Sequence, residues 1–415
     1  MKSGEFIKSL AISLLAALSG IACNSGSSGD PVPASAAVLS SPAVNLASPP
    51  VGSNVMPVTV NGSLCGGGGA FYNDICVSVT ICKQGTSNCQ TVDNILLDTG
   101  SYGLRVFNQA FSVPLDPVTD GSGHPLANCV GFLDGSADWG PVKWADLVLG
   151  GESPVTVPIQ VIDSTFGTVP GSCGIPETDP GQAGFNGILG VGQFVYDCGS
   201  GCVTDPTVGR YFSCTGSTCS GTVVPLAQQV QNPVTSLGVD NNGVILELPS
   251  VPATSASSAG GVLVLGIGTQ SNNMPSGVTT FPADSTTGNF QTIFNGHTYS
   301  SSFIDSGSNG LFFPVNGLIA NCSGPYNAWL CPASETLLTA TNRGTAGSPS
   351  GVVHFEIGNY INLANSGGSA FENIGGDDGS STQFDWGLPF FFGKKVYVGI
   401  KGKASVLGTG PYWAY

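Results

Sequence analysis

The feature that most constrains this chain is a short pattern that occurs twice, 207 residues apart. The first copy lies in "NILLDTGSYGLRVF" (94–107) and the second in "SSFIDSGSNGLFF" (301–313). Both copies read as two apolar residues, Asp, Thr or Ser, Gly, Ser, any residue, Gly and Leu. The acids are Asp98 and Asp305, and 305 − 98 = 207. Because the flanks match as well, we interpret the pattern as a duplication and expect two related halves.

Each copy places an acid where an apolar strand ends. The small residue and the Gly that follow let the chain turn sharply and approach the other copy. If a twofold axis relates the halves, Asp98 and Asp305 meet across it. Two carboxyls about 3 Å apart cannot both ionise, so the pair shares a proton. The ionised member takes a proton from water, and the neutral member hydrogen-bonds the carbonyl that this water attacks. This chemistry hydrolyses a peptide bond without a metal, a cofactor or a covalent intermediate.

The composition favours an all-β architecture. Only 9% of the 415 residues are charged, whereas the chain has 61 Gly and 28 Pro. Long amphipathic helices need charged residues on their solvent face, but short strands joined by Gly, Asn, Ser and Pro turns do not. We expect short helices at 225–230 and 334–340. The net charge of −15, with 11 Lys and Arg in all, leaves no basic patch for phosphates, so no nucleic-acid partner is expected.

The N-terminus predicts export. Lys2 and Lys8 flank the apolar run 10–22, which is too short for a comfortable membrane span and is typical of a secretory signal. Small residues followed by Cys23 resemble a bacterial lipoprotein signal, in which this Cys receives lipid after cleavage. Gly20 stands where that signal usually has Leu. An ordinary signal peptide that is cleaved nearby is therefore the alternative.

The domain organisation follows from these features. We expect a signal peptide at 1–22 and a lipid-anchored flexible tether, rich in Ser, Ala, Pro and Gly, at 23–57. We assign 58–255 to an N-terminal β lobe with the first Asp motif and 256–415 to a C-terminal β lobe with the second. The membrane is then a partner through the lipid anchor, and the folded part faces the periplasm or the cell exterior as a monomer.

Cysteine usage predicts disulfides. There are 13 Cys, and lipidation of one leaves 13 − 1 = 12, an even number that can form six bridges. Five pairs are close in sequence: Cys65 and Cys76, Cys82 and Cys89, Cys198 and Cys202, Cys214 and Cys219, and Cys322 and Cys331. Such pairs suit local loop staples in an oxidising compartment. His124, His297 and His354 are scattered and no pair of Cys-x-x-Cys units occurs, so no zinc site is expected.

With these motifs the sequence resembles the pepsin-like aspartic proteases. "FNGILGVG" (185–192) is similar to the apolar-apolar-Gly motif that threads beneath the first catalytic loop of that family. "NPVTSLGV" (232–239) and "GGVLVLGIG" (260–268) look like strands of its inter-lobe sheet, and "GLPFFFGKKVYVGI" (387–400) like the C-terminal stretch of its second lobe. Together with the lipoprotein signal and the Cys-rich insertion (198–219), the motifs also resemble an uncharacterised bacterial lipoprotein family related to these proteases.

The resemblance implies a bilobal all-β fold with a cleft between the lobes, and an aspartic endopeptidase that acts on a peptide or protein substrate. Asp98 and Asp305 would be the catalytic dyad. Thr99 and Ser306 would lock each loop to the opposite one. The other supports would be Ser101 and Ser308, through hydrogen bonds to the outer carboxylate oxygens, and Gly100 and Gly307, through their N–H groups.

The sequence departs from that family at several positions. Arg105 stands seven residues after the first Asp, where the family commonly has Trp. The expected flap, 129–151, offers Phe132 and Trp139 but no Tyr. The second apolar-apolar-Gly motif reads "LPF" (388–390), without the Gly, and the tether contains no basic prosegment. These departures favour an alternative, a catalytically inactive surface binding or structural protein that retains the protease fold. The two intact Asp motifs favour the active hydrolase.

Overall fold

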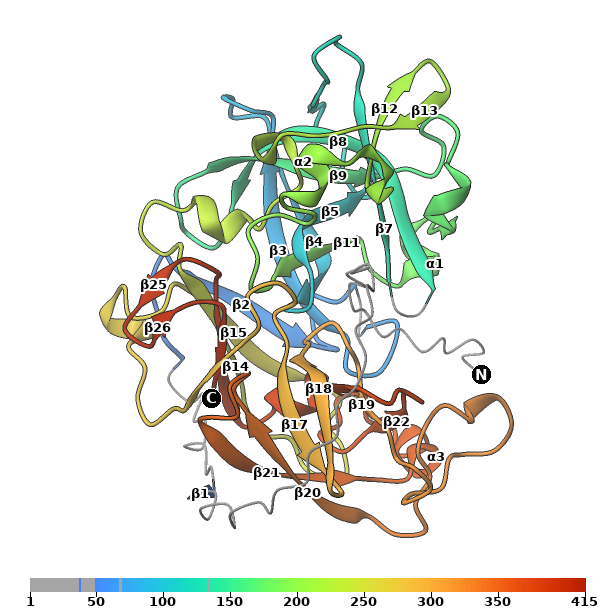
Figure 1. Cartoon of the computed structure of the whole chain (residues 1–415), viewed down its shortest axis with the longest axis vertical. Coiled ribbons are helices and arrows are strands. Elements are labelled where there is room, and N and C mark those ends of the chain that lie inside the picture. The colour runs from blue at the N-terminus through green and yellow to red at the C-terminus, as the bar shows by residue number, and fades with distance from the viewer. Residues whose placement is uncertain (1–36, 39–48, 67–68, 133–134) are drawn as a thin grey trace, which may run out of the picture.

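The computed structural model describes residues 37–38, 49–66, 69–132 and 135–415 (Figure 1). The predicted signal peptide, Cys23 and most of the predicted tether lie outside the described residues. Within the described part, strands predominate and every α-helix is short, which confirms the all-β prediction. The three α-helices there are α1 (Pro180–Ala183), α2 (Gly201–Thr204) and α3 (Tyr360–Ala364). Sparse charge and frequent Gly and Pro explain why no longer helix forms.

One large sheet joins strands from both ends of the chain. Its strands are β2 (Val55–Val60), β3 (Ile75–Cys82), β4 (Cys89–Asp98), β5 (Tyr102–Phe107), β6 (Asp116–Pro117), β7 (Leu126–Gly131), β8 (Ser136–Val148), β9 (Val155–Ile162), β10 (Ile175–Pro176), β11 (Gly187–Val191), β12 (Tyr211–Thr215), β13 (Thr218–Gly221), β14 (Gly243–Leu248), β15 (Ala259–Leu265), β16 (Thr280–Pro282), β24 (Lys394–Gly399) and β27 (Tyr412–Ala414). β14 pairs with both β15 and β24, so the C-terminal segment is hydrogen-bonded into the layer that the N-terminal segment begins.

A second sheet is formed almost entirely by the C-terminal half. Its strands are β1 (Ala37–Val38), β17 (Phe290–Phe294), β18 (His297–Ile304), β19 (Leu311–Phe313), β20 (Thr336–Arg343), β21 (Ser350–Ile357), β22 (Gly375–Asp377) and β23 (Gln383–Trp386). A small hairpin consists of β25 (Ala404–Ser405) and β26 (Gly408–Thr409). Figure 1 shows β3–β13 gathered at one end of the molecule and β17–β23 at the other, with β2, β14 and β15 between them.

The same three-stranded arrangement occurs once in each sheet. In the first sheet, β11 runs parallel to β4 and antiparallel to β5. In the second, β23 runs parallel to β18 and antiparallel to β19. In each case the first strand leads into an Asp motif and the second strand leaves it. The duplicated sequence pattern therefore corresponds to a duplicated local structure.

One apolar core lies beneath both Asp motifs. The largest cluster of buried side chains includes Leu97 and Ile188 from the first sheet and Ile304, Leu311 and Trp386 from the second. Burial of large aliphatic and aromatic side chains stabilises a protein by about 1.5–3 kcal/mol for each. Because this cluster is continuous, the strands that carry the two acids share one apolar support.

Two sequence-based boundaries need correction. β2 begins at Val55, inside the predicted tether, because its residues pair with β15 (Val58 opposite Gly261). The expected helix at 334–340 is wrong. That segment enters β20, in which buried and exposed side chains alternate opposite β21. Period-two burial favours the strand over the local helical preference.

Candidate functional site

Asp98 and Asp305 occupy equivalent places at the ends of two strands. Asp98 is the last residue of β4, and Asp305 follows the last residue of β18. Their side chains are in hydrogen-bonding contact, and both residues are 0% exposed. In each loop, the N–H two residues later donates to the acid: Gly100 N to Asp98 Oδ1 at 2.7 Å and Gly307 N to Asp305 Oδ1 at 2.8 Å.

The hydroxyl residues after the two acids interlock the two loops. Thr99 Oγ1 donates to Ile304 O at 3.0 Å and accepts from Ser306 N at 3.0 Å. Ser306 Oγ donates to Leu97 O at 2.7 Å and accepts from Thr99 N at 3.1 Å. Each hydroxyl therefore satisfies a buried donor and a buried acceptor of the opposite strand–loop junction. This reciprocal set of four bonds fixes the separation of the two acids.

The two Ser residues at the third position after each acid differ. Ser308 Oγ donates to Asp305 Oδ2 at 2.9 Å. The Ser101 side chain is near enough to Asp98 to lower its pKa, but its hydroxyl makes no hydrogen bond of ordinary length to another described residue. The pair is therefore symmetric in its backbone contacts and asymmetric in its side-chain contacts.

The environment disfavours charge on both acids. Burial raises the pKa of Asp98, and its polar contacts with Asp305, Ser101 and Gly100 oppose that rise. Burial, and then the charges of Asp98 and Asp385, raise the pKa of Asp305 well above its usual range. Burial, followed by the charges of the two acids, also raises the pKa of Tyr102. Asp98 is thus the member better suited to ionise, and Asp305 the member better suited to keep a proton.

The structure corrects the position of the second Gly motif. Gly190 pairs with Asp98 in the first half. In the second half Asp305 N donates to Trp386 O at 3.0 Å, so Gly387 is the counterpart of Gly190. A methyl group on Gly387 would clash with Gly310 O, as one on Gly190 would clash with Tyr102 N. The segment 388–390, which was expected to be the motif, begins directly after Gly387. The second motif therefore does contain its Gly.

This correction reveals a residue that sequence reasoning missed. The second motif reads Asp385-Trp386-Gly387, with an acid in place of the first apolar residue. Asp385 is 2% exposed and lies near enough to Asp305 that a negative charge on it would raise the pKa of Asp305. The polar residue concealed the motif, although the Trp-Gly pair at the end of a strand could have identified it. A third carboxyl therefore lies beside the dyad.

Arg105 belongs to a buried polar network. Its guanidinium donates to Asn128 Oδ1 at 2.7 Å, to Gln160 Oε1 and to Asp197 Oδ2 at 3.1 Å. The Arg105 and Asp197 side chains are only 1% and 0% exposed. Tyr211 Oη donates to Asp197 Oδ1 at 2.6 Å. Arg105 thus ties β5 to β7 and β9 and, through Asp197, to Tyr211 of the Cys-rich insertion.

The two predicted flap aromatics lie in different places. Phe132 follows β7 and is buried in the main core cluster. Trp139 lies in β8, donates through Nε1 to Phe166 O at 2.8 Å and packs edge-on against Phe212 at 5.4 Å. The Trp139 side chain therefore faces the Cys-rich insertion within a separate apolar cluster.

The hairpin of β7 and β8, which holds most of the expected flap (129–151), is bounded on both sides. β12 pairs with β7, and β10 pairs with β8. The Cys129–Cys173 disulfide adds a covalent link over 44 residues. These contacts restrict the motion of the hairpin relative to the insertion.

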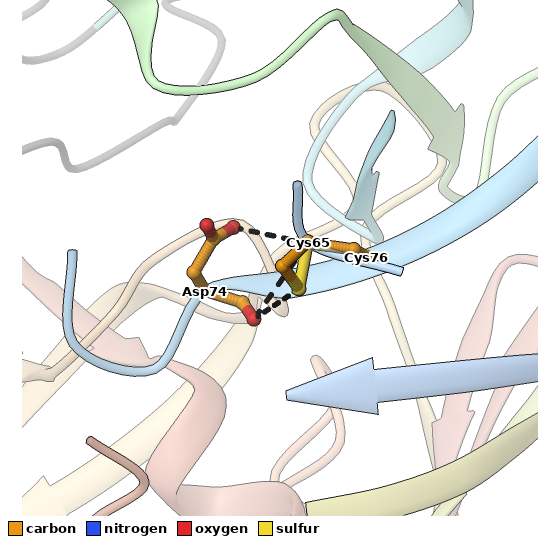
Figure 2. A group of neighbouring side chains, drawn as sticks. All are labelled: Cys65, Asp74 and Cys76. Carbon is orange, nitrogen blue, oxygen red and sulfur yellow. Dashed lines mark hydrogen bonds between the residues drawn. A yellow bond between two sulfur atoms is a disulfide. The ribbon is translucent and has the colours of Figure 1, made fainter. Parts of the chain in front are cut away.

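One group of side chains has the spacing of a metal site, namely Cys65, Asp74 and Cys76. Figure 2 shows that the two sulfurs are joined in a disulfide, with Asp74 beside them. Cys76 Sγ contacts Asp74 Oδ1 at 3.4 Å, and Ala70 N donates to Asp74 Oδ2 at 3.1 Å. A disulfide offers no thiolate ligand, so these residues do not fit a metal ion in this oxidised state.

All five predicted local disulfides are present, and Cys129 pairs with Cys173 as the sixth. Six bridges are typical of a protein that folds in an oxidising, extracytoplasmic environment. In the described part of the chain, no helix has the length and apolarity needed to cross a membrane.

Comparison with known proteins shows a family relationship. The family described as "Protein of unknown function (DUF3443)" matches residues 50–415, which include both Asp motifs, Asp385 and all six disulfides. No curated protein matches the chain. The match extends over nearly the whole described part, and the chain therefore belongs to the DUF3443 family.

Proposed function

We propose that this protein is an exported, bilobal hydrolase of the pepsin-like aspartic protease type, which cleaves peptide bonds with water activated between Asp98 and Asp305. One observation carries the proposal. Two carboxyls from duplicated loops are in hydrogen-bonding contact, and reciprocal hydroxyl–backbone bonds hold the loops. A duplicated structural turn needs no such pairing of buried acids, whose desolvation is costly.

The proposed mechanism follows from the different environments of the acids. Asp98, ionised, accepts a proton from the water as its oxygen attacks the carbonyl carbon of the scissile bond. Asp305, protonated, donates a hydrogen bond to the carbonyl oxygen and stabilises the negative charge that develops there. Proton transfer from the carboxyl pair to the amide nitrogen then allows the C–N bond to break. The pair returns to its singly protonated state, so the proton balance closes.

A second candidate is a binding protein that keeps the fold without turnover. Two observations favour it: the dyad is 0% exposed, and the flap hairpin is bounded by strands on both sides. Turnover requires water and substrate to reach Asp98 and Asp305. Under the hydrolase proposal, the opening must come from a movement of the two halves.

Digestion of a denatured protein mixture across about pH 3 to 8 tests the proposal, because dyad chemistry depends on one shared proton. The variants are Asp98→Asn, Asp305→Asn and a matched control, Asp93→Asn, which alters an exposed acid on the same strand. We expect wild type and the control to cleave and both dyad variants to lose cleavage by at least about 100-fold. Equal cleavage by wild type and Asp305→Asn would contradict the proposal.

If neither wild type nor any variant cleaves, a binding assay distinguishes the hydrolase from the binding protein. A peptide with a secondary alcohol in place of the scissile carbonyl mimics the tetrahedral intermediate and binds an active dyad more tightly than its parent peptide. Tight binding of the alcohol that Asp305→Asn abolishes would retain the hydrolase proposal. Equal binding of both peptides by wild type and Asp305→Asn would favour the binding protein.

We also propose that a lipid on Cys23 anchors the protein to a membrane. Cys23→Ser should move the protein from the membrane fraction to the soluble fraction, since no other acylation site is proposed. Fractionation of cells that express each form measures this. The control is Cys23→Ser joined to an unrelated lipoprotein signal and tether, which should return the protein to the membrane. Soluble wild-type protein would contradict the anchor and support an ordinary signal peptide.

A further inference from the structure

Asp385 breaks the symmetry of the candidate site. Gly190 and Gly387 are equivalent by their pairing with the two Asp motifs. Two residues before them stand Ile188 in the first half and Asp385 in the second. Ile188 is 0% exposed and belongs to the apolar core. A carboxyl at the equivalent buried position therefore calls for an explanation beyond packing.

The Asp385 carboxyl accepts no hydrogen bond from the described residues. Both of its oxygens are buried, and neither has a hydrogen-bond partner of ordinary length among the described residues. Its polar neighbour is the Ser308 side chain, and the charged groups that face it are Asp378 and Asp98, together with Asp305. An ionised carboxylate that is buried among other acids and receives no hydrogen bond is strongly disfavoured.

Ser308 explains why Asp385 lacks a donor. A Ser hydroxyl has one hydrogen, and that of Ser308 is directed to Asp305 Oδ2 at 2.9 Å. The Ser308 oxygen therefore remains able to accept a hydrogen but not to donate a second one. In the first half, where Ile188 replaces the acid, the Ser101 hydroxyl makes no such bond to Asp98.

We propose that Asp385 is a proton-carrying positioning residue of the dyad: its carboxyl donates to the Ser308 hydroxyl and so keeps the hydrogen of that hydroxyl directed to Asp305. The Ser308 Oγ to Asp305 Oδ2 bond is present, and a proton on Asp385 would extend it into a chain from Asp385 through Ser308 Oγ to Asp305 Oδ2. Burial raises the pKa of Asp385 well above its usual range, in agreement with a protonated carboxyl at neutral pH. The role of Asp385 in catalysis rests on the proposed hydrolase function. The hydrogen bond from Asp385 to Ser308, which extends the bond from Ser308 to Asp305, is proposed independently of that function.

The chain makes the two acids unequal. A hydrogen bond to a carboxylate favours its ionised form, so the fixed Ser308 hydrogen moderates the high pKa of Asp305. An ionised Asp385 would do the opposite, because its negative charge would raise the pKa of Asp305 further. Removal of the Asp385 carboxyl should therefore raise the pKa of Asp305 if Asp385 is protonated, and lower it if Asp385 is ionised.

Carbon-13 NMR of the full chain, with aspartate labelled at the carboxyl carbon, tests the proposal without any need for cleavage. Asp98→Asn, Asp305→Asn and Asp385→Asn assign the three resonances by difference. We expect the Asp385 resonance at pH 7 to have the chemical shift of a protonated carboxyl. An Asp385 carboxyl that is ionised at pH 7 would overturn the proposal.

Two substitutions at 385 separate the hydrogen bond from the charge. Asp385→Ile copies the first half and removes the donor, so the upper apparent pKa of the dyad should rise by at least about half a unit, or about threefold in proton affinity. Asp385→Asn keeps an N–H donor and should leave that pKa within about 0.2 unit of wild type. Ser308→Ala removes the same hydrogen from Asp305 and should shift the pKa in the same direction as Asp385→Ile.

A fall of that pKa in Asp385→Ile, or no change, would overturn the proposal, and the Asp385 carboxyl resonance of wild type at pH 7 remains the test if Asp385→Ile does not fold. If the protein also cleaves peptides, the alkaline limb of its pH–rate profile should move upward in Asp385→Ile and not in Asp385→Asn. If the Asp385 carboxyl is protonated at pH 7 as expected, but wild type neither cleaves nor binds the alcohol peptide more tightly than its parent, this inference is retained and the hydrolase is rejected.

Discussion

Gly100 and Gly307 occupy positions next to the dyad where a side chain has no room. A Cβ on Gly100 would lie 2.8 Å from Asp305 Cγ, and one on Gly307 would lie 2.9 Å from Asp98 Oδ1. Each Gly therefore admits the acid of the opposite loop, and its N–H also binds the acid of its own loop. In both copies of the pattern, the Gly two residues after the Asp is therefore required by the close approach of the opposite loop.

We predict that Gly100→Ala and Gly307→Ala each lower the free energy of unfolding by about 1–3 kcal/mol, because the added methyl group forces the carboxyls apart. Urea unfolding measures this. Gly260→Ala is the control, since a Cβ there meets nothing within 4 Å, and it should change stability by less than about 0.5 kcal/mol. A neutral Gly100→Ala would contradict the close approach of the two loops.

The interlocking hydroxyls make a second prediction at the residue scale. Thr99→Val and Ser306→Ala each leave a buried N–H and a buried carbonyl without a partner, at a cost of about 1–3 kcal/mol. Because the two residues bridge the same pair of loops, the double variant should cost less than the sum. Thr91→Val, which removes half of an exposed hydroxyl pair with Thr80, is the control and should be almost neutral. Additive losses would show that the loops are held independently.

Among the elements, the β-strands around Arg105 depend on one buried charge pair. Arg105 lies on β5, and its partners come from β7, from β9 and from the turn that contains Asp197. A buried ion pair contributes little when it is intact, but removal of one partner leaves an uncompensated charge. Arg105 is therefore a structural residue of this half.

We predict that Arg105→Met lowers the free energy of unfolding by about 3–5 kcal/mol, because Asp197 loses the buried cation that donates to it. Lys83→Met is the matched control. It removes the cation of a pair with Asp116 whose side chains are 35% and 58% exposed, and it should cost less than about 1 kcal/mol. Urea unfolding of both variants at one pH makes the comparison, and equal small losses would contradict the assignment of a buried pair.

For the whole molecule, the buried acids couple stability to pH. Asp98, Asp305 and Asp385 all have pKa values above their ordinary value of 3.8 in the folded state. The folded protein then binds more protons than the unfolded chain at pH values above 3.8. Their contribution to stability is complete below that pH and is lost as the pH rises through the folded-state values. Asp120, whose pKa is lowered to about 2, acts in the opposite direction, and its contribution is lost as the pH falls from 3.8 towards 2.

We predict that the free energy of unfolding declines from about pH 5 to pH 8 and that Asp305→Asn makes this decline shallower, by up to about 1.4 kcal/mol per pH unit. Urea titrations at several pH values measure both slopes. The exposed substitution Asp93→Asn should leave the slope of wild type unchanged. Identical slopes for wild type and Asp305→Asn would show that Asp305 has no raised pKa in the folded protein.

Local patterns in the sequence were sufficient for several features. The two Asp motifs identified the duplicated loops, and the composition indicated the all-β class. Five disulfides could be predicted because each links Cys residues at most 11 positions apart. In all these cases the information lies within a few residues, where turn chemistry and short loops restrict the possible structures.

Other features depended on contacts between distant segments. The strand at 336–343 prevailed over a local helical pattern because β17 and β21 pair on its two sides. The Cys129–Cys173 bridge and the partners of Arg105 join segments whose approach depends on how the strands of the first half pair. The equivalence of Gly387 with Gly190 became visible only from the register of β23 beside β18.

The candidate site shows the same division. Asp98 and Asp305 were found from the repeat, because duplication left the same letters around both acids. Asp385 was not found, because its neighbours in sequence are apolar and its motif departs from the repeat. Only the folded chain brings it to Ser308 and the dyad, since strand register, which is set by long-range hydrogen bonds and by a shared core, decides which buried acids meet.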